Sequence, residues 1–119
     1  MDILIKKGFI CPIVSKAFTG DILVSGGKIK KISESITAKD VQIIDAKGKF
    51  VLPGFIDAHS HIGLFEEGVG QYYQDGNEAT DPITPQVRAI DAFNPQDSAI
   101  KKALSGGVTT TMILPGSAN

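Results

Sequence analysis

The chain has 119 residues, a hydrophobic content of 42% and a charged content of 21%, a composition typical of a soluble globular domain with a buried core. With 12 basic and 13 acidic residues the net charge is −1, so no surplus of positive charge favours nucleic acid or an anionic membrane as a partner. The single cysteine, Cys11, excludes an internal disulfide and fits a reducing compartment. The N-terminus lacks a signal-peptide layout and no apolar run approaches about 20 residues, so we expect a cytoplasmic protein.

Residues 1–52 alternate short β-rich runs with turns, which predicts a small antiparallel β unit. A pair of glycines, Gly26 and Gly27, separates two of these runs and predicts a hairpin, because glycine adopts positive φ without steric cost. Lysines alternate with apolar residues, as in a sheet that has one face in water. The expected strands cover residues 3–5, 9–14 with an interruption at Pro12, 21–24, 28–32, 41–44 and 50–52.

The character of the chain changes at Pro53-Gly54. Residues 55–62 are apolar apart from three polar side chains and predict a central parallel strand. Residues 63–85 show no periodicity and predict a long loop, of a length that is usually functional or disordered. We interpret Tyr72 and Tyr73 in this loop as packing residues. Charged residues on or just after it are interpreted as solvated surface: Glu78, Asp81 and Arg88.

A helix and a further strand follow the loop. Asn94-Pro95 predicts the start of the helix, since asparagine caps helices and proline favours the first helical position. Gly106-Gly107 predicts its end. Residues 108–114 predict a second buried strand that contains Thr109, Thr110 and Thr111. Strand, loop, helix and strand together predict a βαβ unit, and hence a parallel pair.

The only two histidines, His59 and His61, lie one residue apart near the end of the expected strand 55–62. Side chains at i and i+2 leave one face of a strand, with their backbones about 7 Å apart at a rise of about 3.3 Å per residue. Asp57 lies on the same face. Such histidines can also be satisfied core residues, but unpaired polar groups in a buried strand are costly. We therefore favour half of a metal site with His59 and His61 as ligands.

Three blocks of the sequence resemble the N-terminal part of the metal-dependent amidohydrolase superfamily. The most specific is Pro53-Gly54-Phe55-Ile56-Asp57-Ala58-His59-Ser60-His61. The others are Gly26-Gly27-Lys28-Ile29 with Ile44-Asp45-Ala46-Lys47-Gly48, and Gly106-Gly107-Val108-Thr109-Thr110-Thr111. The tail Pro115-Gly116-Ser117-Ala118-Asn119 is most similar to the imidazolonepropionase-related branch.

The resemblance implies an α/β fold: residues 1–52 form part of a small β-sandwich, and residues 53–119 form the first βαβ unit of a truncated (β/α)8 barrel. The histidines then lie at the C-terminal end of the first barrel strand, where barrel active sites are found. It implies a divalent metal, with zinc as the expected ion and one or two ions in the full-length enzyme, bound by His59 and His61. Asp57 is expected to support these ligands rather than to catalyse.

The implied activity is hydrolysis of C–N bonds in cyclic amides or related small molecules by metal-activated water. The further ligands and the catalytic aspartate of the family have no matching positions, so no catalytic residue is assigned. We expect the chain to be an inactive N-terminal fragment of a longer enzyme that forms homo-oligomers or associates with the missing C-terminal portion. The alternative is a non-catalytic or degenerate binding or assembly module with an incomplete metal site.

Overall fold

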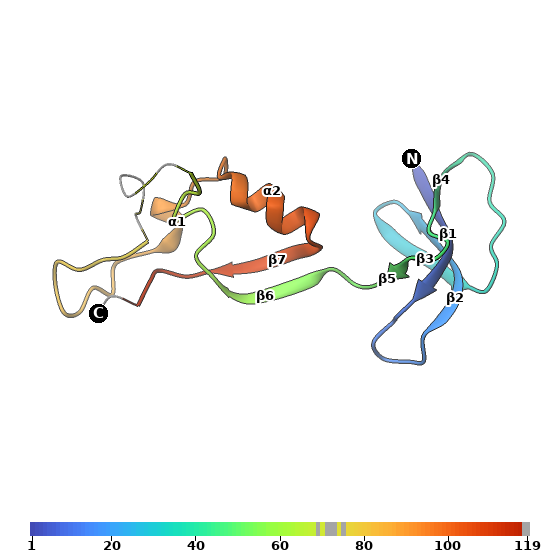
Figure 1. Ribbon diagram of the computed structural model, residues 1–119, viewed down its shortest axis with the longest axis horizontal. Helices are drawn as coiled ribbons and strands as arrows, with labels where there is room; N and C mark the ends of the chain where they lie inside the picture. The colour runs from blue at the N-terminus through green and yellow to red at the C-terminus, as the bar shows by residue number, and fades with distance from the viewer. Residues whose placement is uncertain (69, 71–73, 75, 118–119) are drawn as a thin grey trace. The chain divides into compact units, whose positions relative to one another are not determined.

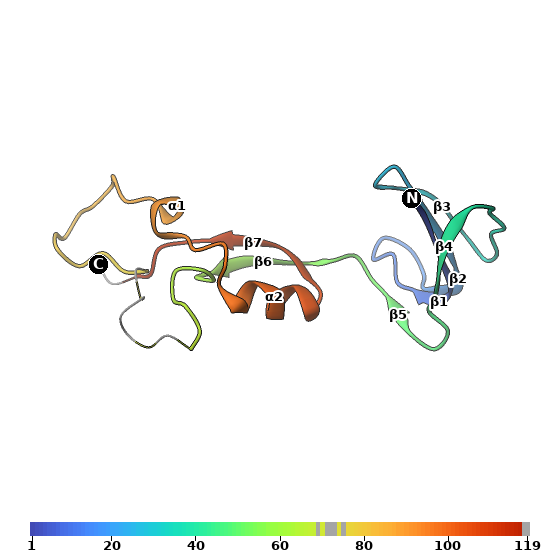
Figure 2. The ribbon, with the colours of Figure 1, turned by 90° about the horizontal axis from the view of Figure 1, so that it is seen from above.

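The computed structural model describes residues 1–68, 70, 74 and 76–117. The chain forms two compact units, Met1–Pro53 and Gly54–Asn119 (Figures 1 and 2). The first consists of strands, whereas the second combines strands with helices, so the chain is a mixed α/β protein with a strand-rich N-terminal part. Neither helix in the described residues has the length and apolar character that a membrane span requires.

The N-terminal unit is a five-stranded sheet in the order β3-β2-β1-β4, with β5 paired to a later part of β1. The predicted hairpin is confirmed, since β2 and β3 pair antiparallel on either side of Gly26 and Gly27, whose φ angles are 58° and 72°. The strands are β1 (Asp2–Ile10), β2 (Phe18–Ser25), β3 (Lys28–Ser33), β4 (Val41–Asp45) and β5 (Phe50–Val51).

Strand β1 differs from the prediction in two ways. It is one continuous strand rather than two, because Lys7 adopts a φ of 60° and the register with β2 shifts between Ile5 and Gly8. Such a bulge lets a strand bend and continue. The strand ends before Pro12, and Ile13 is exposed beyond it. The sheet is also not purely antiparallel, because β4 and β5 both pair parallel to β1.

A buried carboxylate ties the parts of this unit together. Asp21 is only 2% exposed and forms an ion pair with the Nζ of Lys6 at 2.6 Å. It also accepts the backbone N–H groups of Lys7 and Ile36, at 2.9 and 2.8 Å. Ile36 lies in the connection between β3 and β4, so this network fixes that connection against the sheet. Apolar residues complete the core: Leu4, Ile10, Ile22, Ile36 and Ala46.

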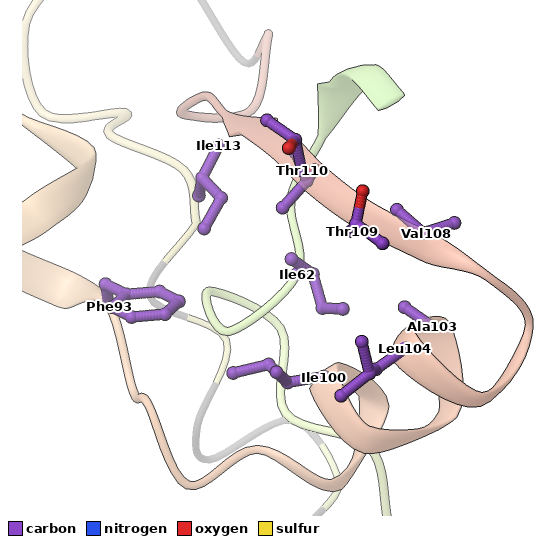
Figure 3. Close-up of a pocket in the computed structure, with 10 residues that line it drawn as sticks. Ile62, Phe93, Ile100, Ala103, Leu104, Val108, Thr109, Thr110 and Ile113 are labelled. Carbon is purple, nitrogen blue, oxygen red and sulfur yellow. The ribbon is translucent and has the colours of Figure 1, made fainter. Parts of the chain in front are cut away.

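The C-terminal unit is built on two strands and two helices, and the predicted parallel pairing is confirmed. Strand β6 (Phe55–Ser60) pairs parallel with β7 (Val108–Ile113), and helix α2 (Ser98–Ser105) lies between them in sequence and contacts β7. A four-residue helix, α1 (Ala89–Ala92), precedes α2. An apolar cavity of about 180 Å³ lies between α2 and β7, with Ile62, Phe93 and Leu104 in its wall (Figure 3).

The start of α2 differs from the prediction. Asp97, not Asn94, is the N-cap, and its side chain accepts the backbone N–H of Ala99 at 3.0 Å. Asn94 instead closes a local turn by accepting the N–H of Gln96. Both are residue types that favour caps, and Pro95 occupies the turn between them rather than the first helical position. The helix ends at Gly106, close to the predicted position.

Candidate metal centre

Strand β6 carries Asp57 and His59, and His61 follows directly after its end. The structure brings the two predicted ligands together, because their ring centroids lie 5.3 Å apart and the ring planes are 86° apart. His59 is exposed and His61 is half-buried. The ring of His61 also meets the ring of Phe65 edge to face, with centroids 5.8 Å apart. The two imidazoles therefore form one cluster at the end of the strand.

This separation fits two imidazoles on one zinc ion. Zinc binds histidine nitrogen at about 2.0–2.1 Å in tetrahedral geometry, which places the centroids of two ligating rings roughly 5 Å apart. The distance of 5.3 Å agrees with that value. Nitrogen donors at this spacing also suit other first-row divalent ions. The side chains present are thus compatible with the metal that the sequence predicts.

One ring nitrogen of His61, Nδ1, forms a hydrogen bond to the backbone. Its Nδ1 lies 2.7 Å from the carbonyl oxygen of Leu114, the residue that follows β7. A carbonyl oxygen can only accept, so Nδ1 carries the proton and donates it. In the neutral ring this leaves Nε2 with a free lone pair. Histidines that bind metals show this arrangement, in which the second nitrogen donates to a carboxylate or a backbone carbonyl and thereby fixes the tautomer and the ring.

The hydrogen bond observed for the Asp57 side chain is to the backbone and not to an imidazole ring. Its Oδ1 accepts the backbone N–H of His59 at 3.1 Å, and the residue is exposed. The pairing of β6 with β7 is irregular between Asp57 and Ser60. The carboxylate therefore provides a partner for a backbone group in the stretch where the ladder is interrupted. This contact shapes the backbone from which the two histidines project.

Within the described residues, no third His, Cys, Asp or Glu joins the two histidines to form a cluster that could hold a metal ion. Structural zinc sites use four protein ligands and catalytic sites usually use three. A metal bound at this position would therefore have two candidate donors among the described residues, half the number of a closed site.

Two other charged residues singled out in the sequence have local partners. Arg88 forms a bidentate ion pair with Asp91 on the surface, at 2.7 and 3.0 Å. Its hydrogen bonds hold the pKa of the Asp91 carboxyl below the ordinary value. Glu78 accepts the backbone N–H of Thr80. Tyr72 and Tyr73 lie outside the described residues.

An open hollow of about 340 Å³ lies beyond the ends of both strands. Its wall includes Leu64 and Pro115, which follow β6 and β7, and it also includes Arg88 and Asp91. In sheets of parallel strands, ligands bind outside the carboxyl ends of the strands. The hollow is therefore at the end of the β6–β7 pair where a ligand is expected.

The sequence analysis did not identify the partners of two groups that follow β6, the ring of His61 and the N–H of Gly63. The carbonyl of Leu114 is a backbone atom, and a backbone atom has no residue type to recognise. Asp97 is 4% exposed, and its second oxygen accepts the N–H of Gly63 at 3.0 Å. Its signal is present in the sequence, since aspartate precedes the periodic apolar residues Ala99 and Ile100, but Asn94-Pro95 offers a competing start a few residues earlier.

A family model described as "Amidohydrolase family" matches residues 42–104. Among curated relatives, the amidohydrolase tasK of Hapsidospora irregularis is 43% identical over 104 residues, 84% of this chain and 11% of the relative. A dihydroorotase of Aquifex aeolicus is 34% identical over 116 residues, 97% of this chain and 22% of the relative. A crystal structure of an amidohydrolase from Thermotoga maritima superposes with a TM-score of 0.91 at 64% identity.

That superposition covers 98% of this chain and 30% of the Thermotoga maritima chain. The chain thus spans less than a third of the length of each of these proteins. The family match includes the stretch that carries both histidines as well as most of α2. On this evidence, and on the order of motifs along its sequence, the chain belongs to the amidohydrolase family.

Proposed function

We propose that this chain supplies the first two ligands of the metal centre in an enzyme that hydrolyses a C–N bond of a cyclic amide. His59 and His61 would hold a divalent ion, with zinc as the expected metal. The observation that carries the proposal is the hydrogen bond from His61 Nδ1 to the carbonyl of Leu114, 2.7 Å long. It leaves Nε2 as the donor atom, on a ring whose centroid lies 5.3 Å from that of His59.

When bound, the ion supplies a polarising charge that activates water and the substrate carbonyl. The chain's own residues have three tasks. His59 and His61 donate nitrogen lone pairs from the end of one strand. Leu114 keeps the proton of His61 on Nδ1 and so prevents Nε2 from being protonated in the neutral ring. Asp57 holds the backbone of His59 through its N–H.

The substrate class rests on the relatives. The name dihydroorotase denotes an enzyme that acts on dihydroorotate, which is a cyclic amide. We extend this to a cyclic amide or a related small molecule as the substrate of the protein to which these residues belong. The similarity of the tail 115–119 to the imidazolonepropionase-related branch stays a prediction, and it concerns the same class of ring C–N bond.

We further propose that residues beyond these 119 complete the catalytic centre. The support is the ligand count, since the described residues offer two clustered donors where a catalytic zinc site usually has three. We therefore expect the 119-residue chain alone to bind a metal ion but not to hydrolyse a substrate. Hydrolysis is expected only for a protein that carries this sequence within a length comparable to that of its relatives.

Metal binding by the chain tests the proposal. Zn²⁺ is titrated into the 119-residue chain by calorimetry, alongside His59→Ala, His61→Ala and the control Lys101→Ala on the exposed surface of α2. We expect one zinc ion per chain, loss of binding in both histidine variants, and no change in the control. Binding that survives both histidine variants refutes the ligand assignment, and a chain that binds no zinc at all refutes the metal centre.

A further inference from the structure

We infer that Asp97 is a positioning residue for His61: its buried carboxylate fixes the turn that carries the imidazole. The inference rests on the proposed function, in which His61 is a metal ligand. Asp97 lies 36 positions after His61 in the numbering, and it is one of two buried charged residues among those that the structure describes. The other, Asp21, belongs to the N-terminal unit.

The two oxygens of Asp97 have different partners. Oδ1 accepts the N–H of Ala99 at 3.0 Å and thereby caps helix α2. Oδ2 accepts the N–H of Gly63 at 3.0 Å, in a buried position. A helix cap needs only the first contact. The second contact joins the helix to the turn that follows β6, so the residue does more than begin a helix.

Gly63 is held from its other side as well. Its carbonyl accepts the N–H of Asn94 at 2.9 Å. Its φ is +80°, and a Cβ at this position would lie 2.5 Å from the ring of Phe93. The segment from Phe93 to Asp97 therefore forms hydrogen bonds with both the N–H and the carbonyl of Gly63. It also leaves no space for a side chain at this position.

The hydrogen bonds of Gly63 constrain His61 as well, because His61 lies only two positions earlier in the chain. The N–H of Leu64 donates to the carbonyl of His61 at 3.0 Å, and the N–H of Ile62 donates to Oγ of Ser60 at 3.1 Å. The backbone from residue 60 to residue 64 is thus held by hydrogen bonds at successive positions. The ring of His61 projects from this backbone and donates to the carbonyl of Leu114. If Gly63 is released, the turn rotates and the ring loses its alignment with that carbonyl.

Asp97→Ser separates the two roles of the carboxylate. Serine is an N-cap residue, so it retains the contact to Ala99, but its single short hydroxyl does not also reach Gly63. The matched control is Lys101→Gly, at an exposed interior position of α2, because glycine weakens the helix and leaves the contact between Asp97 and Gly63 in place. The two variants thus weaken the turn and the helix separately.

Three measurements are made on the 119-residue chain. The ring ¹⁵N spectrum of His61 at alkaline pH, where free imidazole is neutral, reports which ring nitrogen carries the proton. Hydrogen exchange at the Gly63 amide reports its contact to Asp97. Titration with Zn²⁺ alone reports the affinity of the histidine pair. The first two need no metal, and signals of the two histidines are distinguished with His59→Ala.

For Asp97→Ser we expect faster exchange at Gly63, loss of the pure Nδ1–H form of His61, and a zinc Kd that rises about 10- to 100-fold, as for other residues that orient metal ligands. For Lys101→Gly we expect none of these changes. An unchanged His61 spectrum in Asp97→Ser overturns the inference. It is equally overturned if Lys101→Gly moves the His61 spectrum as far as Asp97→Ser does.

If Asp97→Ser does not fold, Asp97→Asn is measured in its place, since it keeps one acceptor oxygen and the shape of the side chain. The His61 spectrum is expected to shift if, and only if, exchange at the Gly63 amide becomes faster, and a change in one without the other overturns the inference. Failure of the proposed function gives a different pattern. In that case the unaltered chain binds no zinc, while the metal-free spectrum and the exchange at Gly63 still show whether Asp97 positions the ring.

Discussion

The substitution Asp21→Asn tests how much stability the N-terminal unit derives from its buried carboxylate. Asp21 accepts three hydrogen bonds, from the Nζ of Lys6 and from the backbone N–H groups of Lys7 and Ile36, at 2.6 to 2.9 Å. Asparagine has the same shape, but it offers one acceptor oxygen and places an NH₂ group where the second oxygen was. At least one donor must then lose its partner in a buried site.

The magnitude follows from the pKa of Asp21. Burial raises this pKa, but the hydrogen bonds from Lys6, Lys7 and Ile36 outweigh burial and lower it from 3.8 to about 2. At 1.36 kcal/mol per unit, this difference corresponds to roughly 2 kcal/mol of folding free energy. Because the folded pKa is depressed, this stability is fully present above pH 3.8 and is lost as the pH falls toward about 2. Removing the charge while burying unpaired donors costs about 2–4 kcal/mol near neutral pH.

The assay is urea unfolding of the chain, followed through the amide signals of β1 and β2, at pH values between about 6 and 2. We expect Asp21→Asn to be less stable at pH 6 and the gap to the unaltered chain to shrink by roughly 2 kcal/mol as the pH falls through the window. Asp45→Asn is the control, because that carboxylate is exposed and accepts the N–H of Lys47, two residues away. A gap that stays constant with pH, or no loss at pH 6, refutes the reasoning.

Three further predictions concern the C-terminal unit. Gly63→Ala should lower its unfolding free energy by about 2 kcal/mol or more, because φ is +80° and the new Cβ meets the ring of Phe93; equal stability in urea would contradict this. Thr111→Val should leave stability unchanged or raise it by up to about 1 kcal/mol, since Oγ1 of Thr111 is buried without a partner among the described residues; a loss of stability would show that the hydroxyl is bonded. Arg88→Ala should raise the pKa of Asp91 in a ¹³C titration without shifting the urea midpoint, because the pair is exposed; a lower midpoint would show that the pair is structural.

Much of the local structure could be predicted, because local patterns determine it. The hairpin at Gly26-Gly27 follows from two residues that tolerate positive φ, and both adopt it. The parallel pairing of β6 and β7 follows from a strand, a helix and a strand in succession. The shared side of His59 and His61 follows from the two-residue period of a strand. Each of these predictions depends on residues that are close in sequence.

The features that were wrong or missed depend on contacts between distant segments. No local signal shows that β4 and β5 pair parallel to β1, and the continuity of β1 depends on the positive φ of Lys7, which is not a residue type typical of that conformation. The cap of α2 is Asp97 rather than Asn94, and its side chain also accepts the N–H of Gly63, whereas the side chain of Asn94 closes a local turn. The tautomer of His61 depends on the carbonyl of Leu114, 53 residues away in the chain.

Because His61 contacts Leu114, the protonation of its imidazole depends on how β6 is aligned with β7. Ser60 lies opposite Ile113, and the residue after each of them forms the ring-to-carbonyl contact. A slip of β7 by a single position would move the carbonyl of Leu114 away from the imidazole, and it would exchange the two faces of the strand as well. The alignment of β7 with β6 therefore decides which ring nitrogen of His61 carries the proton. Mutations that disturb the pairing of these strands far from the histidines can thus leave Nε2 protonated, without a free lone pair, although they do not contact the ring.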